Sequence, residues 1–303
     1  MKKIYFVKDD FADSRLDRWF RRNVSDVPQS LIEKNIRKGN IKVNNKKKLS
    51  SHKLQTKDQI TIFNLKIIVN KNKKKTTPYK ASKKDLQFSS NLFIENNENF
   101  VVINKPSGIS VQSGTKSRRN ILDILRDTPE FNGSTPFSVH RIDKETTGLL
   151  IVAKNRKYAQ LFTSLFRIRK INKIYLGIVL GELEKIKGIF KEDLYHMEKN
   201  EEIRTKAITR YKVIDSNKIY SLIELIPETG RKHQLRKHLL MHGNPILGDT
   251  KYRLSNKHLP KKSTLMLHAY KVNFSINDTK YTFSVKPPES FNNFLKEKYL
   301  KNF

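Results

Sequence analysis

A lysine-rich stretch divides the sequence into two unequal parts. Residues 71–84, KNKKKTTPYKASKK, contain almost no apolar side chains. A segment of this composition cannot bury a core, so it predicts a linker or an arm that contacts an acidic partner. The charge run alone is equally compatible with a merely solvated tether. The 303 residues allow two domains of unequal size, which we place at 13–70 and 88–303, joined by a basic linker at 71–87.

Positive charge is concentrated in the first part. The whole chain has a formal net charge of +33, and residues 1–85 hold 24 Lys and Arg against 8 Asp and Glu, a net of +16. Such an excess requires an acidic partner, either nucleic acid or an anionic membrane. No apolar run approaches the ~20 residues that span a bilayer, and the N-terminal MKKIYFVKDDF lacks the apolar stretch of a signal peptide. We therefore expect a cytoplasmic protein that handles RNA or DNA and has no membrane partner.

The lack of cysteine excludes several kinds of catalytic, crosslinking and metal-binding chemistry. The chain has no Cys, which excludes disulfides, thiolate catalysis and Cys-based zinc sites. His238 and His242 have the spacing of a zinc pair on a helix, but no Glu follows the first His and no third ligand is evident. We expect no metal site and no cofactor.

The first part has the pattern of two small helices followed by short strands. Apolar residues at i, i+3 and i+4 predict a helix that begins near Leu16, with Asp13 or Ser14 as its cap. A second helix is expected from about Ser30 and ends at Gly39. Alternating side chains then predict two strands, at 41–44 and 59–62.

The second part predicts one larger α+β domain. Apolar runs and alternation indicate strands at 101–103, 149–153, 174–180, 207–214, 219–226, 265–274 and 280–285. Helices are expected around 161–166, at 231–242 and at 289–300. Because the strands outnumber the helices and do not alternate regularly with them, a mixed, mostly antiparallel α/β arrangement is favoured.

The densest polar segment is HRIDKETTG, residues 140–148, directly before the apolar run LLIVA. It places His140, Arg141 and Asp143 in a loop that leads into a strand, where a rigid scaffold can hold a reactive side chain. The spacing alone is also compatible with a solvated turn that contains local ion pairs.

A second basic cluster is TGRKHQLRKH, residues 229–238. Arg231 at the start of the expected helix makes a candidate anion site, because the N-terminus of a helix is positively polarised. The alternative is an amphipathic surface helix. Tyr175, taken by itself, has the pattern of an ordinary strand aromatic.

Together these segments resemble a known family. The order KPSG (105–108), HRIDKETTGLLIVAKN (140–155), KIYLGIVLGE (173–182), GRKHQLRKHL (230–239) and GNPILGDTKY (243–252) resembles the RluA-type pseudouridine synthases. The first part, from SRLDRWF to DQITIF, resembles the S4 RNA-binding domain, an alpha-L-like fold. The resemblance covers nearly the whole chain except the linker and part of 184–206. Ile142, Glu145 and Thr147 depart from the usual family residues, which puts fine geometry in question and removes no charged group.

The resemblance implies an isomerase that converts uridine to pseudouridine in structured RNA, with large-subunit (23S) ribosomal RNA as the expected substrate. Its implied catalytic residues are Asp143, which attacks C1′ or takes a proton from C2′, Tyr175, which stacks on the uracil, and Arg236, which pairs with the carboxylate. The implied substrate-binding residues are Arg141, Arg231, Lys105 and His140. Of these, Arg141 fills the space left by the extruded nucleotide, and the KPSG turn with Lys105 supports the site. Isomerisation removes no group and oxidises nothing, which fits an enzyme without cofactor; a monomer is the simplest assembly.

Two other functions compete with this interpretation. A non-catalytic RNA-binding or ribosome-assembly factor on the same fold has no need of Asp143, Tyr175 and Arg236 together. A glycosidase that hydrolyses bases from nucleic acid requires a second, water-activating carboxylate, and no convincing one is found in the sequence.

Overall fold

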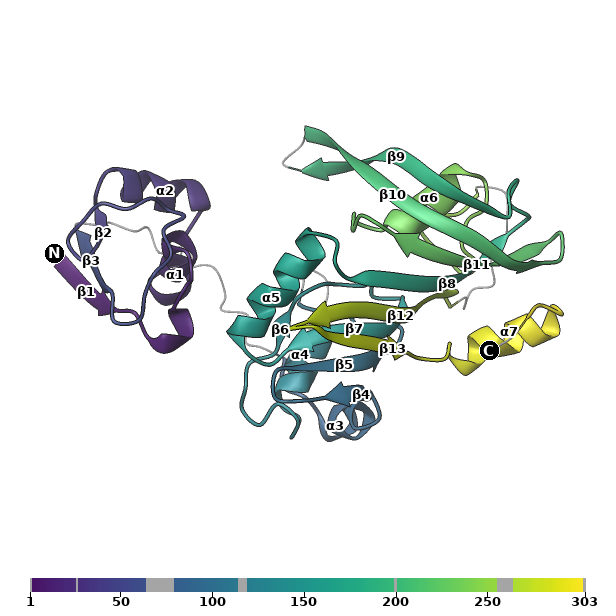
Figure 1. The fold of residues 1–303 in the computed structure, drawn as a ribbon, viewed down its shortest axis with the longest axis horizontal. Helices are drawn as coiled ribbons and strands as arrows, with labels where there is room; N and C mark the ends of the chain where they lie inside the picture. The colour runs from purple at the N-terminus through teal and green to yellow at the C-terminus, as the bar shows by residue number, and fades with distance from the viewer. Residues whose placement is uncertain are drawn as a thin grey trace. The chain divides into compact units, whose positions relative to one another are not determined.

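The chain forms two compact units, Met1–Thr77 and Pro78–Phe303. The computed structural model describes residues 2–25, 27–63, 79–113, 119–198, 201–254 and 264–301 (Figure 1). In these ranges no helix is long and apolar enough to cross a membrane.

The first unit combines two helices with a three-stranded antiparallel sheet. Its elements are β1 (Lys2–Phe6), a 3-10 turn (Asp9–Phe11), α1 (Leu16–Asn23), α2 (Gln29–Arg37), β2 (Ile41–Val43) and β3 (Gln59–Phe63), with strand order β1-β3-β2. Leu16, Trp19 and Phe20 are buried, which confirms the spacing argument for the first helix. The sequence did not reveal β1, because its side chains are mostly exposed and lack a buried face.

The expected cap of the first helix is wrong. Arg15 occupies the N-cap position, and no side chain caps the helix there. Asp13 has a left-handed φ of 59° and accepts a hydrogen bond from Lys53 at 3.1 Å, while the Ser14 hydroxyl donates to a backbone carbonyl earlier in the chain. Asp17, inside the first turn, instead accepts from the Arg15 side chain, so the negative charge still lies at the helix N-terminus.

The second unit is built on one large sheet. Its strands are β4 (Phe93–Asn96), β5 (Phe100–Lys105), β6 (Phe137–Ser138), β7 (Thr147–Ala153), β8 (Asn172–Leu180), β9 (Lys187–Glu198), β10 (Glu201–Ser216), β11 (Tyr220–Pro227), β12 (Leu267–Ile276) and β13 (Thr279–Ser284). Its helices are α3 (Lys83–Ser89), α4 (Ile121–Arg126), α5 (Arg156–Arg167), α6 (Gln234–Met241) and α7 (Glu289–Glu297). The main order is β4-β5-β7-β12-β8-β11-β10-β9, and only the β7–β12 pair is parallel. The mixed, mostly antiparallel architecture is therefore confirmed.

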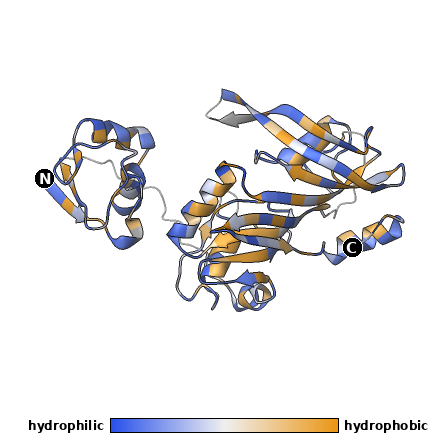
Figure 2. Ribbon diagram, viewed as in Figure 1, coloured by the Kyte–Doolittle hydropathy of each residue, from blue (hydrophilic) through white to orange (hydrophobic). Residues whose placement is uncertain are grey.

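Two hydrophobic layers cover the two faces of the central strands. All seven residues of β7 are buried, and they alternate between the layers: Leu150 and Val152 face one, Leu149 and Ile151 the other. Helix α5 lies on the second face and buries Phe162 there. Figure 2 shows the apolar residues gathered along these central strands. A strand buried on both faces gives a rigid support to the loop that precedes it.

Gly148 allows the parallel pair to form. It has a φ of 103°, and a Cβ there would run into the backbone of Ala269, its partner in β12. The close approach of β7 and β12 thus requires glycine directly after the polar loop.

The expected linker extends too far toward the second part. Residues 64–78 lie outside the described residues, but from Tyr79 the chain packs on the second unit. Ser82 and Asp85 form a capping box at the start of α3, and Asp85 accepts from Arg119 at 2.9 Å. The sequence did not predict this helix, because two exposed lysines begin it and its buried face is short.

Candidate active site

The loop before β7 is fixed to the sheet at several points. The His140 imidazole accepts the backbone N–H of Ile151 through Nε2 at 2.8 Å. The Thr146 N–H donates to the Asp143 carbonyl at 3.2 Å, and Lys105 reaches the Lys144 carbonyl at 3.0 Å. The Asp143 side chain is therefore presented from a backbone with little freedom.

Lys105 lies beneath this loop and not on a cavity surface. It is fully buried, and its ammonium donates to the carbonyls of Pro106, Ile109 and Lys144 at 2.7, 2.9 and 3.0 Å. Burial lowers the pKa of Lys105 to about 7. Because its three donors are already used, this position is that of a loop support and not of a substrate contact.

His140 is likewise turned toward the protein. Its ring stacks on Phe166 at a centroid distance of 4.6 Å, and burial lowers its pKa to about 3, so it is neutral at pH 7. It lines a neighbouring cavity but not the pocket that holds Asp143.

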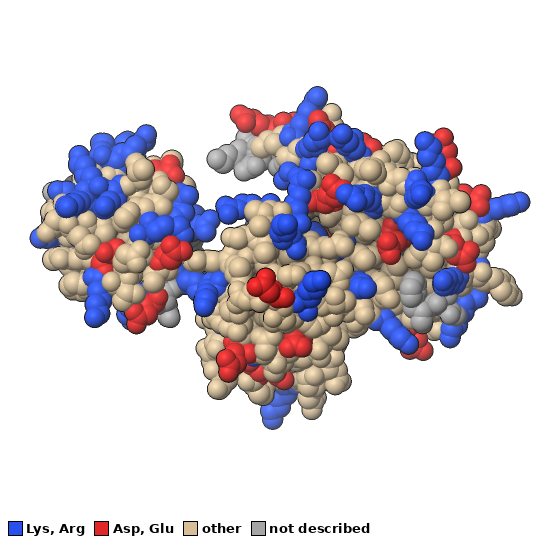
Figure 3. Space-filling view, viewed as in Figure 1, with Lys and Arg blue, Asp and Glu red and all other residues tan. Residues whose placement is uncertain are grey.

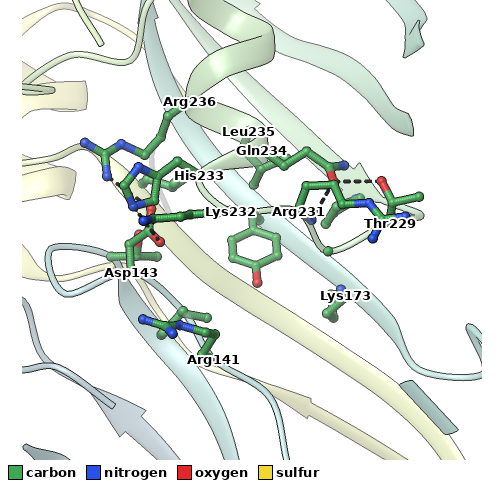
Figure 4. A pocket seen from close by; sticks show the side chains of 16 residues that line it. Arg141, Asp143, Lys173, Thr229, Arg231, Lys232, His233, Gln234, Leu235 and Arg236 are labelled. Carbon is green, nitrogen blue, oxygen red and sulfur yellow. Dashed lines mark hydrogen bonds and ion pairs between the residues drawn. The ribbon is translucent and has the colours of Figure 1, made fainter. Parts of the chain in front are cut away.

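Five of the seven expected site residues meet around one pocket of about 360 Å³. They come from three separate parts of the sequence: Arg141, Asp143, Tyr175, Arg231 and Arg236. Figure 4 shows Asp143 on one side of this pocket, facing Arg236 and His233, with Arg231 farther along the same wall. The pocket size suits a small ligand group, such as a base with part of its sugar.

A three-residue ion network fixes the carboxylate. Arg236 donates to Asp143 Oδ2 at 3.1 Å through NH1 and to both oxygens of Asp249 at 2.7 Å. Asp249 has no exposed side-chain surface, whereas Asp143 is 23% exposed and open to the pocket. Burial opposes charge on both members of the inner pair, but their mutual hydrogen bonds prevail: the pKa of Arg236 is raised and the pKa of Asp249 is lowered.

His233 completes the surroundings of the carboxylate. Its Nε2 lies 3.7 Å from Asp143 Oδ1, and its Nδ1 lies 2.9 Å from the Tyr252 hydroxyl. Burial lowers the pKa of His233, although the charge of Asp143 partly offsets this. Its left-handed φ of 54° is unusual for a residue with a side chain, and such backbone conformations concentrate at functional sites.

Tyr175 lines the pocket from β8 and is nearly buried, with 9% of its surface exposed. Burial and the nearby Asp143 charge both raise its pKa, so the phenol stays protonated at neutral pH. A neutral ring of this kind offers an apolar face and a hydroxyl to a ligand.

Gln234 anchors the segment that carries Arg231. Its amide donates to the Ile208 carbonyl and the Thr209 hydroxyl at 3.0 and 2.9 Å. Its carbonyl oxygen accepts from Thr229 and from the Arg231 N–H, as the dashed lines in Figure 4 mark. The turn before α6 is thereby tied to β10.

Sequence reasoning assigned no role to His233, Gln234 or Asp249. Asp249 carries a usable signal, since it is an acidic residue just after the apolar Ile246-Leu247 pair. The structure also places Glu192 against His238 and His242, at 3.4 and 2.9 Å. Across the described ranges, no group of three or more His, Asp and Glu side chains is arranged to hold a metal ion.

This combination of fold and pocket matches known proteins. Residues 99–241 match the family described as RNA pseudouridylate synthase. A relative from Vibrio vulnificus, ribosomal large subunit pseudouridine synthase C, is 30% identical over 296 residues, 94% of this chain and 92% of the relative. The protein of the same name from Rickettsia bellii is 33% identical over 300 residues, 92% and 96% of the two chains. The chain therefore belongs to the RNA pseudouridylate synthase family and is an isomerase of that class.

Solved structures agree with the fold. Human RNA pseudouridylate synthase domain containing 4 superposes with a TM-score of 0.63 at 27% identity, covering 72% of this chain and 98% of its own. Human RNA pseudouridylate synthase domain containing 1 gives a TM-score of 0.56 at 20% identity over 70% of this chain, which speaks to the fold alone. The resemblance inferred from the motifs is confirmed.

Proposed function

We propose that this protein isomerises specific uridines of large-subunit ribosomal RNA to pseudouridine, with Asp143 as its catalytic carboxylate. The observation that carries the proposal is the partly exposed Asp143 in the pocket, paired with an Arg236 whose charge Asp249 already balances. The similarity to relatives named for the large ribosomal subunit supports ribosomal RNA as the substrate.

The reaction breaks the N1–C1′ bond of uridine, turns the base and forms a C5–C1′ bond. The proton on C5 is lost and N1 gains one, so atoms and charge balance without any added group. Asp143 either attacks C1′ or removes a proton from C2′. Among the described residues that line the pocket, Asp143 is the only carboxylate, which favours isomerisation over hydrolysis by an acid pair.

The other pocket residues take supporting roles. Arg236 stabilises the Asp143 anion, and Tyr175 offers its ring to the uracil, since aromatic faces stack on extruded bases. Arg141 occupies the space that the target nucleotide leaves, because C1′ and C5 become accessible only after extrusion, which costs a few kcal/mol. Arg231 faces the same pocket as a contact for phosphate or ribose oxygens.

The first unit is proposed to bind the same RNA. Residues 13–70 are assigned as an S4-like domain that contacts RNA by shape and phosphate charge. Lys and Arg side chains cover much of the face of this unit that Figure 3 shows. We assign the protein to the cytoplasm as a monomer that uses no cofactor.

The experiment that tests the substrate assignment is pseudouridine mapping after incubation with two RNA pools. Unmodified large-subunit rRNA should gain pseudouridine at a few specific uridines, while total tRNA should gain none. Conversion of tRNA alone would overturn the ribosomal assignment and keep the reaction. Binding without conversion in either pool would instead support the non-catalytic assembly factor, and release of free uracil would support the glycosidase.

A further inference from the structure

A second cavity adjoins the pocket that holds Asp143. It has a volume of about 930 Å³ and shares a wall with that pocket: Arg141, Lys173, Tyr175, Pro227, Thr229, Gly230 and Arg231 line both. Its remaining lining comes mainly from the end of α5, the start of β8 and the β10–β11 pair. A ligand that enters the first pocket therefore extends naturally into the second.

The lining of this cavity is strongly basic. Its charged side chains are five arginines, one lysine and a single carboxylate, Glu228. Arg210 pairs with Glu228 at 2.6 Å, which uses that carboxylate. Among the described residues, no acidic side chain forms an ion pair with Arg167, Arg169 or Arg231. The cavity thus favours an anion beyond those that the described residues supply.

The end of α5 places one of these arginines at the cavity. The Lys170 N–H donates to the Leu165 carbonyl at 2.9 Å, and the Arg169 N–H donates to the Phe166 carbonyl at 3.2 Å. This is a Schellman ending, and Arg169 occupies its left-handed position with a φ of 58°. Glycine is favoured at that position because a Cβ is strained there. The side chain that this ending presents lines the basic cavity.

We propose that this cavity binds the phosphodiester backbone of the RNA strand next to the target uridine, with Arg167 and Arg169 as its phosphate contacts. The inference rests on the proposed function for the identity of the anion. It assigns two adjoining subsites to one strand: the extruded uridine enters the pocket of Asp143, and its neighbour lies along the arginines. Guanidinium groups suit this task because they bind phosphate oxygens in pairs.

The left-handed backbone of Arg169 allows a variant that separates an effect on stability from an effect on RNA binding. Arg169→Gly removes the side chain and relieves the strained φ, so its melting temperature should stay unchanged or rise by about 2–4 °C. Its affinity for RNA should nevertheless fall about tenfold, which is the loss of one charged hydrogen bond. Arg169→Lys keeps the charge but not the paired hydrogen bonds, so its affinity should lie between those of Arg169→Gly and the wild type.

Tyr299 provides the matched control. It holds the left-handed position, with a φ of 54°, in the same type of ending at α7, and its side chain is 94% exposed. Tyr299 does not line the cavity. Tyr299→Gly should therefore change the melting temperature in the same direction as Arg169→Gly and leave RNA affinity unaltered.

The measurement is the binding of the full chain to an unmodified large-subunit rRNA transcript over a series of salt concentrations. Arg169→Gly should bind more weakly, with the slope of log K against log salt reduced by about 0.7, the value for one phosphate of a single strand. Affinity and slope equal to those of the wild type would overturn the inference. If Arg169→Gly fails to fold, Arg167→Ala at the last position of α5 carries the same test.

Binding and conversion are scored separately. A wild type that converts no uridine, together with an Arg169→Gly variant that loses affinity, would refute the proposed function and support the phosphate site. A wild type that converts uridine, together with a variant of unaltered affinity, would refute the phosphate site alone.

Discussion

Arg236 contacts two carboxylates that differ in burial and in hydrogen bonding. Asp249 is fully buried and takes two short hydrogen bonds, whereas Asp143 takes one longer bond and faces the pocket. Since Asp249 neutralises the Arg236 guanidinium, Asp143 does not form a closed ion pair with Arg236. Its Oδ1 receives no hydrogen bond from Arg236 and lies 3.7 Å from His233 Nε2.

Replacing Asp249 by Asn tests this division. The change keeps the shape but leaves the buried guanidinium of Arg236 with Asp143 as its only anion. We expect a loss of as much as about 3–5 kcal/mol in the free energy of unfolding, because the buried guanidinium loses the closer of its two carboxylates. Urea unfolding measures it.

The control for Asp249→Asn is Glu228→Gln, which breaks the ion pair of Glu228 with the mostly exposed Arg210. That pair should contribute no more than about 1 kcal/mol. Equal, small losses in the two variants would show that Asp249 is not the principal partner of Arg236.

At the scale of elements, the parallel contact between β7 and β12 holds the loop of Asp143 in place. His268 of β12 is fully buried; its Nε2 lies 2.9 Å from the Val285 carbonyl and its Nδ1 lies 2.8 Å from the Thr147 hydroxyl. The carbonyl can only accept, so Nε2 carries the proton and Nδ1 accepts from Thr147. The neutral ring of His268 thus links β12 to β7 through Thr147.

This junction should make stability depend on pH. Burial lowers the pKa of His268 to about 4, although the bond to Val285 partly offsets it, while the unfolded residue titrates near 6.5. Between about pH 6.5 and pH 4 the folded state binds fewer protons than the unfolded state. The contribution of His268 to the free energy of unfolding is therefore fully present above about pH 6.5 and is lost as the pH falls toward 4. Relative to His268→Gln, the wild type should lose about 1.4 kcal/mol per pH unit there. Parallel curves of unfolding free energy against pH would contradict this.

The elements that the sequence predicted correctly are those with a continuous apolar face. The periodic residues of α1 and α5 and the apolar run of β7 each satisfied one spacing rule, and the structure confirms them. Strand β9 and helix α3 were missed, because charged residues interrupt their apolar pattern. Their formation depends on partner segments: β9 pairs along its whole length with β10, and Arg119 fixes α3 through Asp85.

The site could be predicted only in part for a related reason. Motif order identified the residues, but the contact between Asp143 and Arg236 spans 93 positions, and no local rule gives it. Lys105 and His140 occur in the same motifs as the pocket residues, but their side chains are buried and point into the protein. Which side of a loop a side chain faces is decided by tertiary packing, and the sequence contains no direct record of it.

At the scale of the whole molecule, we propose that the two compact units divide RNA binding from chemistry. Deleting residues 1–77 should weaken binding to large-subunit rRNA more than it slows conversion of bound RNA, because the pocket lies wholly within Pro78–Phe303. The full chain should also show the steeper decline of affinity with salt, since it neutralises more phosphates. Equal affinities at every salt concentration would show that the first unit does not tether the RNA.

The central claim is that Asp143 is the carboxylate that isomerises uridine. Its most direct test is pseudouridine mapping on unmodified large-subunit rRNA with the wild type, Asp143→Asn and the loop control Glu145→Gln, whose side chain is 48% exposed and outside the pocket. We predict conversion of the same uridines by the wild type and by Glu145→Gln. We predict none by Asp143→Asn, although it still binds the RNA. Conversion by Asp143→Asn at the rate of the wild type would contradict the claim.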